Sequence, residues 1–278
     1  MKILLTGAEG QLGRALQAGL NKHTLIALPR AELDISDLTC VRAVIFREQP
    51  SLVLNAAAYT DVDGAEKDAA AAYAANAVGP RNLALATAEL DLPILHVSSD
   101  YVFDGRAQRP YHEFDAPVPV SVYGKSKLAG EDSVRVMNPR HYIVRTAWLY
   151  SAWGHNFALR MCTQKDRDEV RAVNDQFGSP TYAPHLVSAL ETLLRSEAFG
   201  TYHLAGSGTA SWFDLTRALY QALGARARVC AVPSSTFPHA APRPIFSALT
   251  TLQSPRILLP PWEEGVQAFA QAFAVGNT

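Results

Sequence analysis

Short apolar runs alternate along the chain with longer segments whose apolar residues recur at helical spacing. Continuous apolar runs bounded by turn residues indicate strands that are buried on both faces of a parallel sheet. Such runs predict strands at residues 2–5, 24–28, 52–54, 93–97, 142–145, 169–173 and 202–204. Helices are predicted over residues 14–20, 36–49, 66–90, 123–131, 185–195 and 211–223, with another opening at 154–157. This alternation predicts an α/β fold, a Rossmann-type doubly wound parallel sheet with helices on both faces.

Proline and glycine mark the irregular parts of the chain. Gly79-Pro80 predicts an interruption of the helix at 66–90, and the proline-rich segment 104–119 predicts an exposed loop able to move over a site. The last third is richer in proline and less regular, so we expect it to form a smaller substrate-binding α/β lobe. The expected domains are a nucleotide-binding Rossmann domain at 1–148, joined by about 168–196, and a substrate lobe at 149–167 and 197–278.

A glycine-rich turn joins the first predicted strand to the first predicted helix. Gly7, Gly10 and Gly13 follow the strand at 2–5 with the spacing GxxGxxG. Glycine lets the backbone approach a pyrophosphate closely, and the phosphate charge then lies at the helix N-terminus. The strand–turn–helix context therefore predicts a dinucleotide site, and a glycine-rich turn without a ligand is the alternative.

The end of the second predicted strand carries a basic residue where many NAD sites carry an acid. An Asp or Glu there binds the ribose 2′-hydroxyl of NAD, whereas this chain has Pro29-Arg30. A guanidinium suits a 2′-phosphate, so NADPH is the expected cofactor, with NADH also open to use. The alternative is that Arg30 is only a solvated loop residue. Asp34 and Ile35 follow and are expected near the adenine.

A tyrosine and a lysine four residues apart form the candidate catalytic pair. Tyr123 and Lys127 lie on one face of the predicted helix. A free phenol has a pKa of about 10, and an ammonium about 4 Å away contributes roughly 4 kcal/mol, enough to lower that pKa by some three units. Ser98 and Ser99 end the strand at 93–97, where a hydroxyl can bind a substrate oxygen. Taken alone, the pair favours an exposed helix turn; the upstream glycine turn favours a site.

Composition and charge narrow the class of protein. The chain has 278 residues, a net charge of −1, 48% hydrophobic and 18% charged residues, which predicts a soluble protein without nucleic-acid or membrane partners. Cys40, Cys162 and Cys230 form no CxxC pair, and the eight histidines form no metal-binding motif. We therefore expect no metal site and a reducing compartment. No segment predicts a signal peptide or a membrane span, so a cytoplasmic protein is expected.

Longer strings extend these motifs. They are residues 55–63, 98–103, 123–131, 145–148, 174–181, 202–204 and 211–212, with Arg243-Pro244 and Ser247 near the C-terminal end. On these residues the chain resembles extended short-chain dehydrogenases/reductases nearly end to end, and within them it is similar to the dTDP-4-dehydrorhamnose reductase family. The glycine turn and the Tyr/Lys pair specify only the superfamily, whereas 98–103 and 175–181 narrow the resemblance to this family.

The resemblance implies roles for individual residues. Tyr123 would give its proton to the C4 oxygen of a sugar as hydride arrives from the nicotinamide. Lys127 would bind the nicotinamide ribose and lower the pKa of Tyr123, and Ser99 would complete the triad. The implied cofactor contacts are Gly7, Gly10, Gln11, Leu12, Gly13, Arg30, Asp34, Ile35, Ala57, Ala58, Tyr59, Thr60, Val97, Tyr123 and Lys127. The implied substrate contacts are Ser99, Asp100, Tyr101, Trp148, Asn156 and Arg243.

The implied reaction is NADPH-dependent reduction of the C4 ketone of dTDP-4-dehydro-β-L-rhamnose, a small nucleotide-sugar substrate. The implied assembly is a monomer or homodimer. A 4,6-dehydratase would need an acid after Asp100, where Tyr101 stands, and a 4-epimerase usually has a larger substrate lobe. Two alternatives remain open: a reductase of another nucleotide 4-keto-6-deoxysugar, and a non-catalytic NADP-binding regulatory subunit. The intact set of Ser99, Tyr123 and Lys127 argues against the second.

Overall fold

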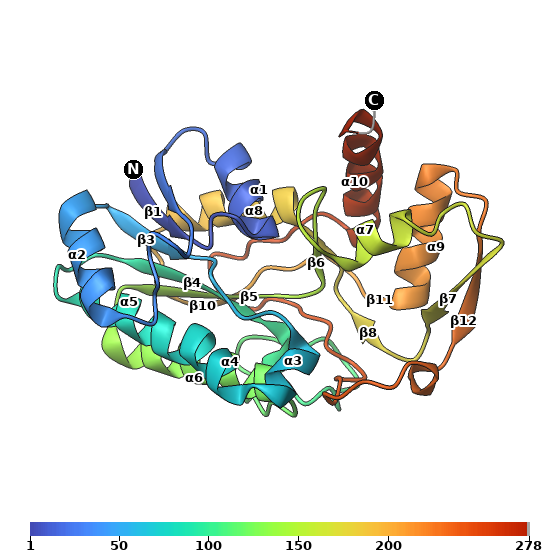
Figure 1. Cartoon of the computed structure of the whole chain (residues 1–278), viewed down its shortest axis with the longest axis horizontal. Coiled ribbons are helices and arrows are strands. Elements are labelled where there is room, and N and C mark those ends of the chain that lie inside the picture. The colour runs from blue at the N-terminus through green and yellow to red at the C-terminus, as the bar shows by residue number, and fades with distance from the viewer. Residues whose placement is uncertain (277–278) are drawn as a thin grey trace.

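The computed structural model describes residues 1–276 and is built on a six-stranded parallel sheet (Figure 1). The strand order is β10-β5-β4-β3-β1-β2. The strands are β1 (Lys2–Thr6), β2 (Thr24–Leu28), β3 (Leu52–Asn55), β4 (Ile94–Ser99), β5 (His141–Thr146) and β10 (Gly200–His203). The order reverses between β1 and β3, as in doubly wound folds. The predicted fold class is confirmed.

Helices cover both faces of this sheet. Helices α1 (Gln11–Gly19) and α8 (Ala183–Leu194) lie on one face, and α2 (Leu38–Glu48), α5 (Gly79–Ala88) and α6 (Val122–Met137) lie on the other (Figure 1). Successive residues of β1 point to opposite faces. Leu5 packs with Leu16 and Leu190, whereas Leu4 packs with Ile45 and Leu83. The apolar strand runs are thus explained by burial on both sides.

The alanine-rich segment between β3 and β4 is interrupted next to the predicted Gly79-Pro80 and also at Asp68. It forms α3 (Val62–Lys67), α4 (Ala69–Tyr73), a π-helical turn η1 (Ala74–Val78) and α5. The π-helical turn interrupts the α-helix at the predicted place, since it ends at Val78 and Pro80 falls in the first turn of α5. A second break, which was not predicted, lies at Asp68, whose carboxylate accepts a hydrogen bond from the Ala71 N–H at 2.9 Å and caps α4.

A second body of helices and short strands lies beside the carboxyl edge of the sheet (Figure 1). Its helices are α7 (Phe157–Cys162), α9 (Trp212–Leu223) and α10 (Trp262–Gly276), packed around a core that includes Leu219, Val266 and Phe269. Its strands pair as β7 (Glu169–Val173) with β12 (Arg228–Val232), β6 (Leu149–Tyr150) with β9 (Thr181–Tyr182), and β8 (Phe177–Gly178) with β11 (Ala210–Ser211). Helix α10 was not predicted; only the short 3-10 turn η3 (Ser234–Thr236) is helical between β12 and α10.

Two strands lie on the other side of the expected domain division. Strand β10 pairs with β5 in the main sheet, although residues 197–278 were assigned to the substrate lobe. Strand β7 pairs with β12 outside that sheet, although residues 168–196 were expected to join the Rossmann domain. A short apolar run looks the same in either sheet, so sequence could not separate them. The remaining boundaries stay predictions.

The loop at 104–119 is anchored at Tyr111 and Glu113, although other residues of it are exposed as expected. Tyr111 is 6% exposed and its ring stacks on Phe103 with centroids 4.2 Å apart. Glu113 accepts hydrogen bonds from the His203 N–H at 2.8 Å and the Thr251 hydroxyl at 2.5 Å. These contacts fix the loop to β10 and to the C-terminal segment.

Candidate active site

The expected site residues converge at one edge of the sheet. Because the six strands run parallel, the carboxyl ends of β1, β3, β4 and β5 meet where α/β proteins bind ligands. The glycine turn follows β1, residues 56–60 follow β3, Ser99 ends β4 and Trp148 follows β5. The first turn of α6 brings Tyr123 beside Ser99.

The glycine turn is a close-packed backbone loop. Gly7 has φ +69°, and a Cβ atom there would lie 2.6 Å from the Ala57 nitrogen. A Cβ at Gly13 would lie 2.2 Å from the Gly7 oxygen, whereas a Cβ at Gly10 would meet that oxygen at 3.4 Å. Among the described residues no side chain caps the N-terminus of α1, and its first turn holds no acid. The helix therefore presents backbone N–H groups and the positive end of its dipole to an anion.

Two residues that follow the turn differ in what they can offer a cofactor. Gln11 Nε2 donates to the Leu149 carbonyl at 3.3 Å, while Gln11 Oε1 is buried without a partner in the described part of the chain. Such an orphaned oxygen is a group that a bound ligand can satisfy. Leu12 is buried in the core under α8, so only its backbone can face a cofactor.

Arg30 is exposed at the end of β2. Its side chain is 87% exposed, and its guanidinium lies 4.0 Å from the Asp34 carboxylate. Hydrogen bonds from Ser36 lower the pKa of Asp34 and fix it in place. The Ile35 side chain is instead buried beneath Gly79, where a Cβ would lie 2.4 Å from it. Arg30 is thus accessible to a 2′-phosphate, and Ile35 serves packing.

Asn76, in the π-helical turn, holds the segment after β3. The Tyr59 N–H donates to Asn76 Oδ1 at 2.9 Å, and Asn76 Nδ2 donates to the Tyr59 carbonyl and to Ser126 Oγ, both at 3.0 Å. Ser126 Oγ in turn donates to the Tyr123 carbonyl at 2.8 Å. Asn76 therefore ties residues 57–60 to the helix of the catalytic pair. Sequence reasoning missed it; a lone asparagine within an alanine-rich helix was the available signal.

Tyr123 lies beside Ser99 at the centre of the site. Burial raises the pKa of Tyr123 to about 12, the Ser99 hydroxyl opposes the rise, and the Asp100 carboxylate adds to it. The expected lowering of this pKa by Lys127 is wrong here, because burial dominates and the lysine is not among the groups that act on the phenol. A phenol with this pKa carries its proton at neutral pH, as a proton donor must.

Lys127 is buried behind the tyrosine. Only 2% of it is exposed, and its Nζ donates to the Val97 carbonyl at 2.7 Å. Burial lowers the pKa of Lys127 to about 8, and the Glu131 carboxylate opposes that shift. Glu131 is itself held by Arg145, with N–O distances of 2.9 and 2.6 Å. Val97, an expected cofactor contact, thus fixes the lysine through its carbonyl.

Asp100 and Tyr101 lie in the 3-10 turn η2 (Asp100–Val102) that follows Ser99. Asp100 Oδ1 accepts from Ser99 Oγ at 2.9 Å and Oδ2 accepts from Ser247 Oγ at 2.6 Å. Burial raises the pKa of Asp100 to about 6 against these hydrogen bonds. The Tyr101 ring meets the Tyr123 ring edge-on at 5.5 Å, and burial raises the pKa of its phenol. Ser247, noticed in the sequence only as part of a motif, belongs to the site.

Trp148 forms a flat aromatic surface after β5. It stacks on Trp212 with ring centroids 3.5 Å apart and an interplanar angle of 3°. Its φ is +45°, which is uncommon for a bulky residue and marks strain of the kind found at functional sites. A Cβ at Gly178 would lie 2.4 Å from the Trp148 ring, so this glycine makes room for it.

Asn156 caps α7. Its Oδ1 accepts from the Leu159 N–H at 3.0 Å, and its Nδ2 donates to the Ser151 carbonyl at 2.8 Å. Both ends of the amide are therefore used within the protein, and its expected contact with substrate stays a prediction.

Arg243 brings the C-terminal segment to the site. Its Nη2 donates to Asp63 at 2.8 Å, and the Ala241 N–H donates to the same carboxylate at 2.9 Å. Arg243 Nη1 is buried without a partner among residues 1–276, and the guanidinium lowers the pKa of Tyr101 against the larger effect of burial. The sequence showed Asp63 only as part of the motif at 55–63, because its partner Arg243 is 180 residues away.

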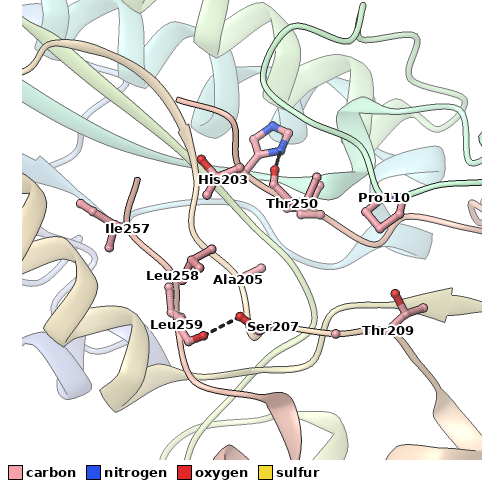
Figure 2. Close-up of a pocket in the computed structure, with 12 residues that line it drawn as sticks. Pro110, His203, Ala205, Ser207, Thr209, Thr250, Ile257, Leu258 and Leu259 are labelled. Carbon is pink, nitrogen blue, oxygen red and sulfur yellow. Dashed lines mark hydrogen bonds between the residues drawn. The ribbon is translucent and has the colours of Figure 1, made fainter. Parts of the chain in front are cut away.

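A separate cavity of about 140 Å³ lies between the segment after β10 and the C-terminal segment (Figure 2). His203 Nδ1 is 3.1 Å from the Thr250 carbonyl oxygen, and Ser207 Oγ donates to the Leu259 carbonyl at 2.5 Å. None of its lining residues is an expected site residue. This cavity is therefore not the candidate active site.

The sheet order and the glycine turn define a Rossmann fold, and Ser99, Tyr123 and Lys127 lie together at its carboxyl edge as expected for a short-chain dehydrogenase/reductase. The uncapped α1 terminus, the orphaned Gln11 oxygen and the exposed Arg30 fit a dinucleotide with a 2′-phosphate. Within the described residues, no group of three His, Cys, Asp or Glu side chains could hold a metal ion, and no helix is long and apolar enough to cross a membrane.

Comparisons with known proteins identify the family. The model described as the RmlD substrate binding domain matches residues 1–275. The dTDP-4-dehydrorhamnose reductase of Mycolicibacterium smegmatis is 42% identical over 290 residues, covering 100% of this chain and 87% of that protein. The dTDP-4-keto-6-deoxy-D-glucose reductase of Streptomyces niveus is 39% identical, covering 99% and 97%. The structure of dTDP-4-dehydrorhamnose reductase from Bacillus anthracis in complex with NADP has a TM-score of 0.94 at 35% identity, covering 98% and 99%. The chain belongs to the RmlD substrate-binding domain family.

Proposed function

We propose that the protein is an NADPH-dependent reductase of the C4 ketone of dTDP-4-dehydro-β-L-rhamnose, forming dTDP-β-L-rhamnose for cell-surface polysaccharide synthesis. The observation that carries this proposal is the placement of Ser99, Tyr123 and Lys127 together at the carboxyl edge of the parallel sheet, with Lys127 fixed on the Val97 carbonyl. The names of the similar proteins and the NADP of the B. anthracis structure support it.

The chain's own residues would handle the proton and the charge. NADPH, when bound, supplies the hydride. Tyr123, protonated at neutral pH, gives its proton to the C4 oxygen, so that its O–H bond breaks as the alcohol O–H bond forms. The Ser99 hydroxyl holds that oxygen. Lys127 binds nicotinamide ribose hydroxyls, since its ammonium is buried and fixed on Val97.

The Rossmann domain would bind the cofactor, and the substrate lobe would bind the nucleotide-sugar. The α1 N-terminus, with residues 10–13, would take the pyrophosphate, and Arg30 the 2′-phosphate. Trp148 and Arg243 would contact the nucleotide-sugar from the substrate lobe, Trp148 with its ring and Arg243 with its free Nη1. We propose that this small-molecule enzyme works in the cytoplasm as a monomer or homodimer.

The test is NADPH oxidation by purified protein with dTDP-4-dehydro-β-L-rhamnose, with the product configuration at C4 checked by NMR. Turnover to dTDP-β-L-rhamnose is the expected result. The second candidate is reduction of another dTDP-4-keto-6-deoxysugar, favoured by the similarity to the Streptomyces niveus reductase, and dTDP-4-keto-6-deoxy-D-glucose tests it directly. Tight NADPH binding without turnover of either sugar would instead indicate a non-catalytic NADP-binding subunit.

A further inference from the structure

Asp100 is a buried carboxyl group that accepts a hydrogen bond from the hydroxyl beside the catalytic phenol. It is 2% exposed. Ser99 Oγ, which lies beside the Tyr123 phenol, donates to Asp100 Oδ1 at 2.9 Å. Ser247 Oγ donates to Asp100 Oδ2 at 2.6 Å. The Ser99 hydroxyl is therefore placed between the Tyr123 phenol and an acid.

The surroundings of Asp100 do not fix it in its ionised form. No cation is among the groups that shift its pKa; burial raises that pKa to about 6, and the hydrogen bonds from Ser247 and Ser99 oppose the rise. The titratable groups that face it are the Tyr123 phenol from α6 and the Tyr101 phenol from its own turn, with Arg243 and Asp63 beyond Tyr101. Asp100 can therefore be either a carboxylic acid or a carboxylate near neutral pH.

A serine hydroxyl carries one proton, so the state of Asp100 decides where Ser99 points it. Next to a carboxylate, Ser99 donates to Asp100, which is the arrangement in the structure. Next to a carboxylic acid, Ser99 accepts from Asp100 and its own O–H is free to donate toward Tyr123. The second arrangement is the one that can return a proton to a phenolate.

We propose that Asp100 resupplies, through the Ser99 hydroxyl, the proton that Tyr123 gives to the substrate. The proposal rests on the proposed reductase function. As Tyr123 loses its proton to the new alcohol, Ser99 passes its proton to the phenolate and receives the proton of the Asp100 carboxylic acid. Asp100 is left as a carboxylate and takes its next proton from water. The relay moves protons only, so no further oxidant or reductant is required.

Asp100→Asn tests the relay because the amide keeps the size and an acceptor oxygen but gives no proton. Stopped-flow NADPH oxidation then separates the first turnover, which uses the proton already on Tyr123, from later ones. We expect the ratio of later to first turnover rates in this variant to be at least about tenfold lower than in wild type. Asp104→Asn, the same change at a carboxylate bound to Tyr111, is the control and should keep the wild-type ratio.

Two outcomes would overturn the relay. If the first turnover of Asp100→Asn slows as much as the later ones, Asp100 only positions its neighbours. If neither slows, another group returns the proton. Failure of the wild-type protein to turn over any 4-keto sugar is a different result, because it would remove the proposed function itself.

Infrared titration of the free protein gives a readout that does not depend on turnover. We expect a carboxylic-acid band that disappears as the pH rises through about 6 and is absent from Asp100→Asn. Ser247→Ala should move its midpoint to higher pH, since the lost hydrogen bond favours the carboxylate. A spectrum that Asp100→Asn leaves unchanged, or a midpoint that Ser247→Ala leaves unmoved, would contradict the proton-holding role.

Discussion

Gly10→Ala separates the binding role of the glycine turn from its structural role. Gly10 has φ −69° and ψ 166°, which alanine also adopts, and the new Cβ would lie 3.4 Å from the Gly7 oxygen, an ordinary contact. Folding without cofactor should therefore change by less than about 1 kcal/mol. The methyl group would instead occupy space at the N-terminus of α1, where we place the pyrophosphate.

The binding cost follows from the hydrogen bonds that the displaced pyrophosphate would lose. A hydrogen bond to a charged group contributes about 1.5–3 kcal/mol, and 1.4 kcal/mol is a tenfold change in affinity. Loss of one such bond predicts a Kd for NADPH roughly 10- to 100-fold higher. The assay is fluorescence titration with NADPH, paired with urea unfolding of the cofactor-free protein.

Gly13→Ala is the matched comparison. Its Cβ would lie 2.2 Å from the Gly7 oxygen and 2.7 Å from the Ala8 oxygen, so this change should destabilise the protein itself by about 1–3 kcal/mol. The reasoning would be refuted if Gly10→Ala bound NADPH like wild type, or if Gly13→Ala left unfolding unchanged.

Three further changes test the site. Arg30→Ala should raise the Kd for NADPH about tenfold or more and leave the Kd for NADH within about threefold of wild type, because only NADPH has a 2′-phosphate. An equal loss of affinity for the two cofactors would contradict this role. The pKa of Lys127 is lowered from 10.5 to about 8, so its buried charge costs stability below pH 8. The free energy of unfolding is measured in urea without cofactor for wild type and Lys127→Met. The wild-type value should rise by about 3 kcal/mol relative to the variant between pH 8 and pH 10.5. The same pH dependence in both proteins would refute this. Glu131→Gln should lower the free energy of unfolding by about 3–5 kcal/mol, because it leaves Arg145 buried and unpaired. Asp132→Asn, at an exposed carboxylate, should lower it by less than about 1 kcal/mol. Urea unfolding measures both, and equal losses would contradict the burial argument.

The fold was predictable because its main signals are local. The apolar run at 2–5 and the glycines after it require a buried strand and a tight turn whatever lies around them. The four-residue spacing of Tyr123 and Lys127 likewise follows from helix geometry alone. The sequence therefore predicts which segments form strands, but it does not predict the sheet to which β7 and β10 belong.

Features that depend on distant packing were out of reach. The pairing of Asp63 with Arg243 joins the first third of the chain to the last. The raised pKa of Tyr123 arises from burial, which spacing does not report, so the sequence suggested the opposite sign. The π-helical turn that holds Asn76 follows no helical period in the sequence. Each of these needs the three-dimensional neighbours of the residue.

The most direct measurement compares wild type with Tyr123→Phe in single-turnover oxidation of bound NADPH by dTDP-4-dehydro-β-L-rhamnose. The change removes one hydroxyl and keeps the ring that meets Tyr101. The account predicts that the variant binds NADPH like wild type but oxidises it at least about 100-fold more slowly, the lower end of general acid catalysis. A variant that reduces the sugar at nearly the wild-type rate would contradict the assignment of Tyr123 as the proton donor.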